Sequence, residues 1–259
     1  MTQDHALRAL GDWLRDRGYR FVTPTPATHA RVNARPGRAE AHSVEDVLGW
    51  SRPFRAGAFP ALERLLAEAG ALHRDGDRLR SAVRFSTVDS DDDDGTGAGA
   101  DTEAGAPALY VHAAFPTTAP GSVFFGPDTY RFIRLVRDAV RPARRLVDVG
   151  CGTGAGGLAV RDRVERLVLA DINPDALRLA RVNAALAGAD DVELIESDVL
   201  AAIDDPIDAV IANPPYLADP GRRTYRDGGG ALGSELSLRI VREALARLRP
   251  GGQLVLYTG

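Results

Sequence analysis

A single glycine-rich stretch decides the fold of this chain: Arg145-Leu146-Val147-Asp148-Val149-Gly150-Cys151-Gly152-Thr153-Gly154. Its apolar first half is typical of a buried strand. The glycines that follow at alternate positions allow the backbone to turn sharply and to approach a ligand closely, next to the start of a helix. The stretch therefore predicts the first strand, loop and helix of a parallel sheet.

The residues around this stretch extend the pattern. Strand patterns cover residues 146–149, 167–170, 192–195, 209–212 and 253–257, and helix patterns cover 154–162, 174–187 and 234–249. Strands that alternate with helix-length connections form a mostly parallel sheet covered on both faces. We therefore predict an α/β fold with a Rossmann-like sheet. Before it, we expect strands at 109–113 and 123–125 and a helix over 128–140 with Asp128 as its N-cap.

The first 88 residues are expected to form a separate small domain. Two helix patterns are each marked by four apolar residues at helical spacing: Leu7, Leu10, Trp13 and Leu14 in the first, and Leu62, Leu65, Leu66 and Ala69 in the second. A hairpin signal, Asp75-Gly76, follows. A helix that runs into a short basic hairpin resembles a winged-helix module, which binds nucleic acid or another protein. With 14 Arg against 10 acidic residues, this segment leaves both roles open.

An acidic stretch separates the two parts. Residues 89–105 hold seven acidic residues and no basic one, with many glycines and alanines. Such a low-complexity, self-repelling stretch is typical of a flexible loop. We therefore predict a winged-helix-like domain over 1–88, a loop over 89–107 and the Rossmann-like domain over 108–259.

Composition excludes several classes of protein. The 259 residues carry a net charge of −4 and 44% hydrophobic side chains, so wholesale disorder is excluded. No apolar run approaches the roughly 18 residues of a membrane helix, and the first residues lack the pattern of a signal peptide, so we expect a soluble, cytoplasmic protein. All 32 basic residues are Arg, which excludes lysine Schiff-base chemistry and a P-loop lysine. The single cysteine, Cys151, excludes an internal disulfide, and the five histidines show no metal-ligand spacing.

The glycine loop by itself fits either a nicotinamide dinucleotide or S-adenosylmethionine (SAM). Three acidic residues favour SAM, because each ends one of three successive predicted strands: Asp148, Asp171 and Asp198. The first can hold the amino group of the methionine end, the second both ribose hydroxyls, and the third the adenine amino group. The carboxyl edge of such a sheet is where ligands bind. Each acid taken singly could equally cap a helix or a turn.

The most specific signal is Asn213-Pro214-Pro215-Tyr216, directly after the fourth predicted strand. The prolines hold the backbone and lack N–H groups, so nearby carbonyl oxygens stay free to accept hydrogen bonds. Asn213 adds a side-chain acceptor, and Tyr216 adds an aromatic face. The segment therefore suits an NH2 group on an sp2 carbon, either an amide or an exocyclic amine of a base.

These motifs resemble the class I SAM-dependent N-methyltransferases, in particular the HemK/PrmC-type protein-glutamine methyltransferases. The segment Phe124-Phe125-Gly126-Pro127-Asp128-Thr129-Tyr130 is similar to the one that precedes their first strand. The resemblance covers about residues 123–259. It implies a substrate site at Asn213, Pro214, Pro215 and Tyr216, and SAM contacts at Thr129, Asp148, Gly150, Cys151, Gly152, Thr153, Gly154, Asp171, Asp198, Val199 and Asn213. The sheet of these enzymes normally has two further strands, which this chain is expected to lack.

We therefore expect direct methyl transfer from SAM to a planar NH2 group, with no metal and no general base. The expected acceptor is a glutamine side chain of a protein. An amino group of adenine or guanine in RNA or DNA would suit the same motif, and the N-terminal domain would then hold the nucleic acid. A regulator that senses SAM without transferring a methyl group is an alternative of another class. A nicotinamide oxidoreductase leaves the Asn-Pro-Pro-Tyr motif unexplained.

Overall fold

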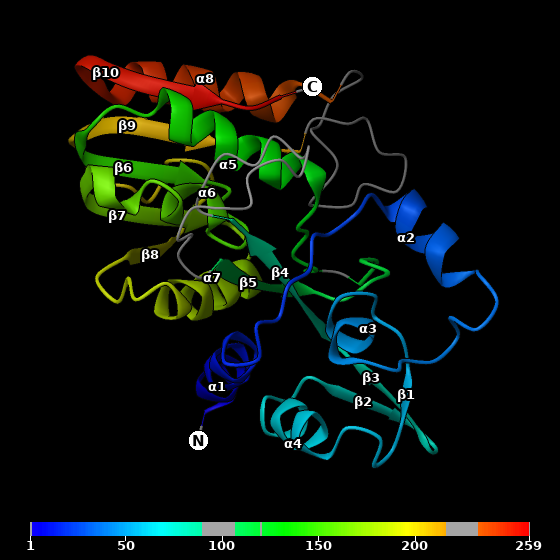
Figure 1. The fold of residues 1–259 in the computed structure, drawn as a ribbon. Helices are drawn as coiled ribbons and strands as arrows, with labels where there is room; N and C mark the ends of the chain where they lie inside the picture. Colours follow the sequence, from blue (N-terminus) through cyan, green and yellow to red (C-terminus); the bar gives the residue numbers. More distant parts are fainter. Residues whose placement is uncertain (1, 90–106, 120, 216–232, 259) are drawn as a thin grey trace, which may run out of the picture. The chain divides into compact units, whose positions relative to one another are not determined.

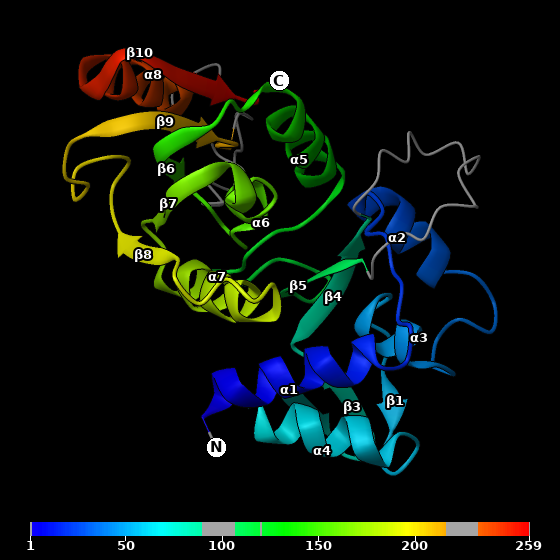
Figure 2. The same ribbon diagram turned by 60° about the vertical axis from the view of Figure 1, so that its left-hand side comes forward.

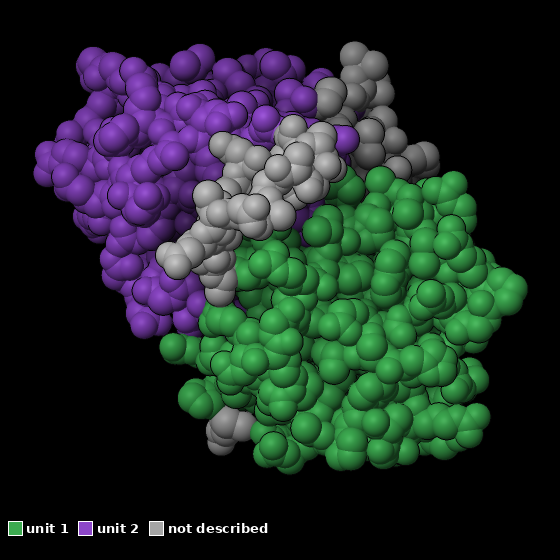
Figure 3. Space-filling model, viewed as in Figure 1, with its two compact units in different colours: residues 1–117, 125–127 green, residues 118–124, 128–259 purple. Residues whose placement is uncertain are grey.

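The computed structural model describes residues 2–89, 107–119, 121–215 and 233–258 (Figure 1). The chain divides into two compact units. Unit 1 consists of residues 1–117 with 125–127, and unit 2 of residues 118–124 with 128–259 (Figure 3). Within the described residues, no helix combines the length and the apolar character that crossing a membrane requires.

The described residues of unit 1 form four helices: α1 (Gln3–Arg15), α2 (Pro26–Asn33), α3 (Val44–Leu48) and α4 (Pro60–Glu68). The apolar stripe predicted for α1 is present, because Leu7, Leu10 and Leu14 are fully buried. Helix α1 lies alongside α4 (Figure 2), whose buried face consists of Leu62, Leu65 and Leu66. The two helix patterns in the N-terminal sequence thus face each other in the core of this unit.

In the described part of unit 1 there are also five short strands: β1 (Phe54–Arg55), β2 (Leu72–Asp75), β3 (Arg78–Ser81), β4 (Val83–Val88) and β5 (Ala108–Ala113). The first three form an antiparallel sheet in the order β1-β3-β2. The hairpin predicted after the second helix is confirmed, with Gly76-Asp77 as its two-residue turn and Gly76 at a φ of +60°. The winged-helix interpretation stays a prediction.

The division of the chain differs from the one that the sequence suggested. We predicted that residues 108–259 form one domain, but β5 pairs with β4 along its whole length, from Val83 with Ala113 to Val88 with Ala108. This antiparallel pairing makes β5 part of unit 1. The acidic stretch therefore connects two paired strands of the same unit, and its residues 90–106 lie outside the described part of the chain.

Within its described residues, unit 2 is built on five strands: β6 (Ala143–Val149), β7 (Val164–Asp171), β8 (Glu193–Glu196), β9 (Ile207–Ala212) and β10 (Leu248–Leu256). All pair in parallel, in the order β10-β9-β6-β7-β8 (Figure 1). This confirms the predicted Rossmann-like sheet. The strand order reverses between β6 and β9, which is the switch point where ligands bind in sheets of this kind.

Helices cover both faces of this sheet: α5 (Pro127–Ala139), α6 (Ala155–Leu158), α7 (Pro174–Leu186) and α8 (Glu235–Arg247). Successive residues of a strand point to opposite faces. Leu146 therefore packs with Phe132 of α5 and Ala180 of α7, whereas Val147 packs with Ile240 of α8. The central strands β9, β6 and β7 are consequently buried on both sides over most of their length, which explains their continuous apolar pattern.

Three local predictions were wrong. Residues 123–125 form no strand, and Asp128 is not the N-cap of α5, because it lies inside the first turn and pairs there with Arg131. The helix expected over 154–162 is only α6, followed by a 3-10 turn at Arg161–Arg163. Glycines at positions 156 and 157 explain its shortness, since glycine is a weak helix former.

Candidate active site

The glycine loop after β6 folds into a tight turn. Gly150, Gly152 and Gly154 have φ angles of +65°, +55° and +76°, a region that other residues rarely adopt. The Cys151 N–H donates to the Ala170 carbonyl oxygen of β7 at 3.0 Å, and the Gly154 N–H donates to the Cys151 carbonyl oxygen at 2.8 Å. The loop is thus anchored to the neighbouring strand and leads directly into α6.

Asp148 lies beneath this loop and is almost completely buried, at 1% exposure. Its Oδ2 accepts a hydrogen bond from the Gly157 N–H of α6 at 2.8 Å. A Cβ atom at Gly157 would lie 2.7 Å from Leu169 and 3.2 Å from this oxygen, so only glycine allows the close approach. Burial raises the pKa of Asp148 to about 7, and the nearby Asp171 carboxylate adds to the rise, while the Gly157 N–H opposes it.

Asp171, at the end of β7, links two loops. Its Oδ2 accepts from the Gly152 N–H and its Oδ1 from the Asn173 N–H, both at 2.9 Å. Burial raises the pKa of its carboxyl group, and these N–H groups lower it. The two buried carboxylates form no ion pair with any described Arg or His. A ligand that brings positive charge or hydroxyl donors would satisfy them.

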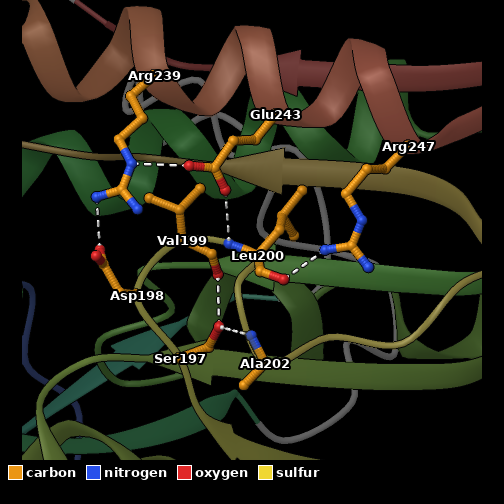
Figure 4. A network of polar contacts seen from close by, with 8 residues as sticks. All are labelled: Ser197, Asp198, Val199, Leu200, Ala202, Arg239, Glu243 and Arg247. Carbon is orange, nitrogen blue, oxygen red and sulfur yellow. Dashed lines mark hydrogen bonds and ion pairs between the residues drawn. The ribbon is translucent and has the colours of Figure 1, made fainter.

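Asp198 follows β8 on the same edge of the sheet. Ser197 donates its N–H to the carbonyl oxygen of Asp171 at 3.0 Å, which places the two acidic positions on adjacent strands. The Asp198 side chain is 52% exposed and pairs with Arg239 of α8 at 2.8 Å (Figure 4). Val199, the next residue, has a φ of +53°, a strained conformation for a β-branched side chain.

The segment Asn213-Pro214-Pro215 continues directly from β9. Ala212 pairs with Val149 of β6, so Asn213 comes out of the sheet beside the start of the glycine loop. Pro214 is buried, and Asn213 is partly exposed. Tyr216, the last residue of the predicted motif, lies outside the described residues. Asp198, Asp171, Asp148 and Asn213 thus follow four neighbouring strands in the order β8, β7, β6, β9.

The remaining predicted residues have different surroundings. Thr129 lies in the first turn of α5 and is partly exposed. Thr153 is buried, and its carbonyl oxygen accepts from the Asn183 side chain of α7 at 2.9 Å. Cys151 is buried as well, and burial together with the Asp148 and Asp171 carboxylates raises the pKa of its thiol well above the ordinary range. A neutral thiol in this loop is not a nucleophile.

Several contributors were missed in the sequence. Asn173 caps α7 and donates its side-chain N–H to the Gly121 carbonyl oxygen at 3.0 Å, which ties the segment before α5 to the loop after β7. Its position directly before Pro174 is a helix-start signal that could have revealed the cap. Arg239 and Glu243 of α8 also reach the site. The signal for them in the sequence is their i, i+4 spacing, which is typical of an ion pair on a helix.

Comparison with known proteins identifies the C-terminal part. Residues 132–258 match the family model of the methyltransferase small domain. This part of the chain is similar to that family, and we call residues 132–258 the methyltransferase domain after it. The methyltransferase domain contains every predicted site residue except Thr129, and the candidate site lies at the carboxyl edge of its sheet.

The methyltransferase domain is similar to release factor glutamine methyltransferases. One from Deinococcus radiodurans is 37% identical over 144 residues, which cover 50% of this chain and 51% of that protein. One from Koribacter versatilis is 32% identical over 178 residues, which cover 60% and 63%. The chain thus spans between half and two thirds of the length of these relatives. Among solved structures, a ribosomal protein L11 methylase from Lactobacillus delbrueckii subsp. bulgaricus matches with a TM-score of 0.42 and 24% identity, covering 53% of this chain and 63% of that one.

Proposed function

We propose that this protein transfers a methyl group from SAM to the side-chain amide of a glutamine in another protein. One observation carries the proposal. Four strand ends present Asp198, Asp171, Asp148 and Asn213 in a row, which is the order of adenine, ribose, methionine and acceptor along SAM and its substrate. With strands about 4.8 Å apart, the row spans about 14 Å. The similarity to release factor glutamine methyltransferases supports an amide acceptor.

The donor set fits this cofactor. SAM carries a positive amino group and a sulfonium, and Asp148 and Asp171 present buried carboxyl groups with no described cation beside them. The positive charge of the ligand would favour the ionised form of both. Asp171 would hold the ribose hydroxyls, because a carboxylate can accept two hydrogen bonds from a diol. Asp198 would accept from the adenine amino group, and Val199 would line the same end. The backbone from Gly150 to Gly154 and Thr129 would enclose the methionine end.

SAM supplies a methyl group that is already activated by the sulfonium, so the protein has to position the acceptor and stabilise charge. An amide nitrogen is weakly basic. The Asn213 side-chain oxygen and the Pro214 carbonyl oxygen would accept its two N–H groups, which increases the electron density on the nitrogen and fixes its orientation. Neither Pro214 nor Pro215 has an N–H that could compete for these acceptors. The methyl C–S bond would break as the C–N bond forms, S-adenosylhomocysteine would leave, and the nitrogen would then give its extra proton to solvent. No proton-accepting side chain would be needed before the transfer.

The first experiment incubates the full chain with radiolabelled SAM and a hypomethylated cell lysate, and then divides the product between protease and nuclease digestion. We expect protease-sensitive label that acid hydrolysis releases as methylamine, because an N-methyl amide hydrolyses to the amine. Asn213→Ala should abolish the label while calorimetry still detects SAM binding.

Three outcomes would contradict the proposal. Nuclease-sensitive label would move the acceptor to an amino group of a nucleic acid. Label that stays attached to an amino acid after acid hydrolysis of the protein would exclude an amide acceptor. SAM binding without any transfer would favour a SAM-sensing regulator.

A further inference from the structure

We propose that Arg239 of α8 is a positioning residue for Asp198 and that it thereby sets the preference of the cofactor site for adenine. The inference rests on the proposed function, in which Asp198 accepts a hydrogen bond from the adenine amino group. Arg239 lies 41 positions further along the chain and does not itself need to touch the base.

The guanidinium of Arg239 is held from two sides (Figure 4). Its Nη1 donates to Asp198 Oδ1 at 2.8 Å, and its Nε donates to Glu243 Oε1 at 2.7 Å. Glu243 lies one turn further along the same helix, and its other oxygen accepts from the Leu200 N–H at 3.3 Å. A planar guanidinium with two charged partners has little rotational freedom. Arg239 therefore fixes where Asp198 Oδ1 points.

The backbone beneath Asp198 is held as well. The Ser197 hydroxyl donates to the Val199 carbonyl oxygen at 3.0 Å and accepts from the Ala202 N–H at 3.1 Å. From α8, Arg247 donates to the carbonyl oxygens of Leu200 and Ile203. These contacts surround Val199, whose backbone is strained by its positive φ. Strained backbone conformations cluster at functional sites. The backbone of this loop is therefore tied to α8, and the direction of the Asp198 side chain is what Arg239 sets.

One oxygen of Asp198 is left for a ligand. Within the described part of the chain, no group donates to Oδ2, and half of the side chain is exposed. Once Oδ1 is held by Arg239, the direction of Oδ2 follows. An adenine amino group donates to such an oxygen, whereas the carbonyl oxygen of hypoxanthine at the same position repels it. The preference between the two bases thus depends on how firmly the carboxylate is oriented.

The test compares S-adenosylhomocysteine with S-inosylhomocysteine, in which hypoxanthine replaces adenine, by calorimetry on the full chain. We expect the wild type to prefer the adenine compound. An exposed ion pair contributes up to about 1 kcal/mol, so Arg239→Ala should reduce this preference about fivefold. Arg239→Lys should restore part of it, because an ammonium keeps the charge but lacks the planar fork. Arg242→Ala is the matched control, since Arg242 is exposed on the same helix without an ion pair to any described residue.

A double-mutant cycle separates positioning from general damage to the fold. If Arg239 acts through Asp198, then Arg239→Ala should not change the base preference of an Asp198→Ala variant. An unchanged preference in Arg239→Ala, or the same loss in both backgrounds, would overturn the inference. A higher affinity of Arg239→Ala for the adenine compound would also overturn the inference. Arg239 would then compete with the adenine amino group for the Asp198 carboxylate. A wild type that binds neither compound would instead refute the proposed function itself.

Discussion

The protonation of Asp148 gives the sharpest test of the structure. The unfolded carboxyl group titrates near its ordinary value of 3.8, whereas burial raises the pKa in the folded protein to about 7. The folded state therefore binds the proton more tightly. This tighter binding of the proton adds to the free energy of unfolding. The contribution is fully present below pH 4 and is lost as the pH rises through 7. At 1.36 kcal/mol per pH unit, this difference in pKa amounts to about 4 kcal/mol.

Asp148→Asn removes this titration. The asparagine side-chain oxygen can still accept from the Gly157 N–H, so the hydrogen bond of 2.8 Å is kept while the buried charge disappears. Relative to the wild type, the variant should gain stability steadily between pH 4 and pH 7 and level off above. The assay is urea unfolding at several pH values in the absence of cofactor. Unfolding should be followed by far-UV circular dichroism, because both tryptophans, Trp13 and Trp50, lie in unit 1.

The control for this experiment is Asp190→Asn, which changes an exposed carboxylate in the same unit. We expect this substitution to change the unfolding free energy only slightly, because the Asp190 side chain is exposed. The reasoning would be refuted if the unfolding free energy of Asp148→Asn differed from that of the wild type by the same amount at every pH. That result would mean that Asp148 is ionised in the folded protein well below neutral pH.

Two further predictions concern the cofactor site and unit 1. Asp171→Asn should weaken binding of S-adenosylhomocysteine, measured by calorimetry, about tenfold or more, because a charged acceptor for two hydroxyl groups is lost. The control is Asp175→Asn, which changes an exposed residue of α7. An equal loss of affinity in this control would contradict the prediction. Asp46→Ala should destabilise unit 1 by about 3 kcal/mol, because it leaves the buried Arg52 guanidinium without its carboxylate partner. Tryptophan fluorescence during urea unfolding reports this loss, and an unchanged midpoint would show that the pair is not needed.

Much of the methyltransferase domain could be predicted because its signals are local. The strand and the glycine loop are encoded within ten residues and the helix follows directly, and strands that run parallel have their carboxyl ends on one edge of the sheet. Asp148, Asp171 and Asp198 could therefore be assigned to one edge without coordinates. The predictions failed where a local signal competed with the fold. Ala108–Ala113 carries a good strand pattern, but nothing in that pattern shows that its partner is β4.

By itself, the sequence determined which residues end the strands, since strand ends and glycine turns depend on neighbours a few positions away. Only the tertiary structure decided the properties of those residues. Burial in the folded protein raises the pKa of Asp148 to about 7. Asp198 is oriented because the fold brings Arg239 of α8 next to it, although the two residues lie 41 positions apart. Burial and long-range ion pairs depend on which elements pack together. That packing is a property of the whole fold, and no short window of the sequence contains it.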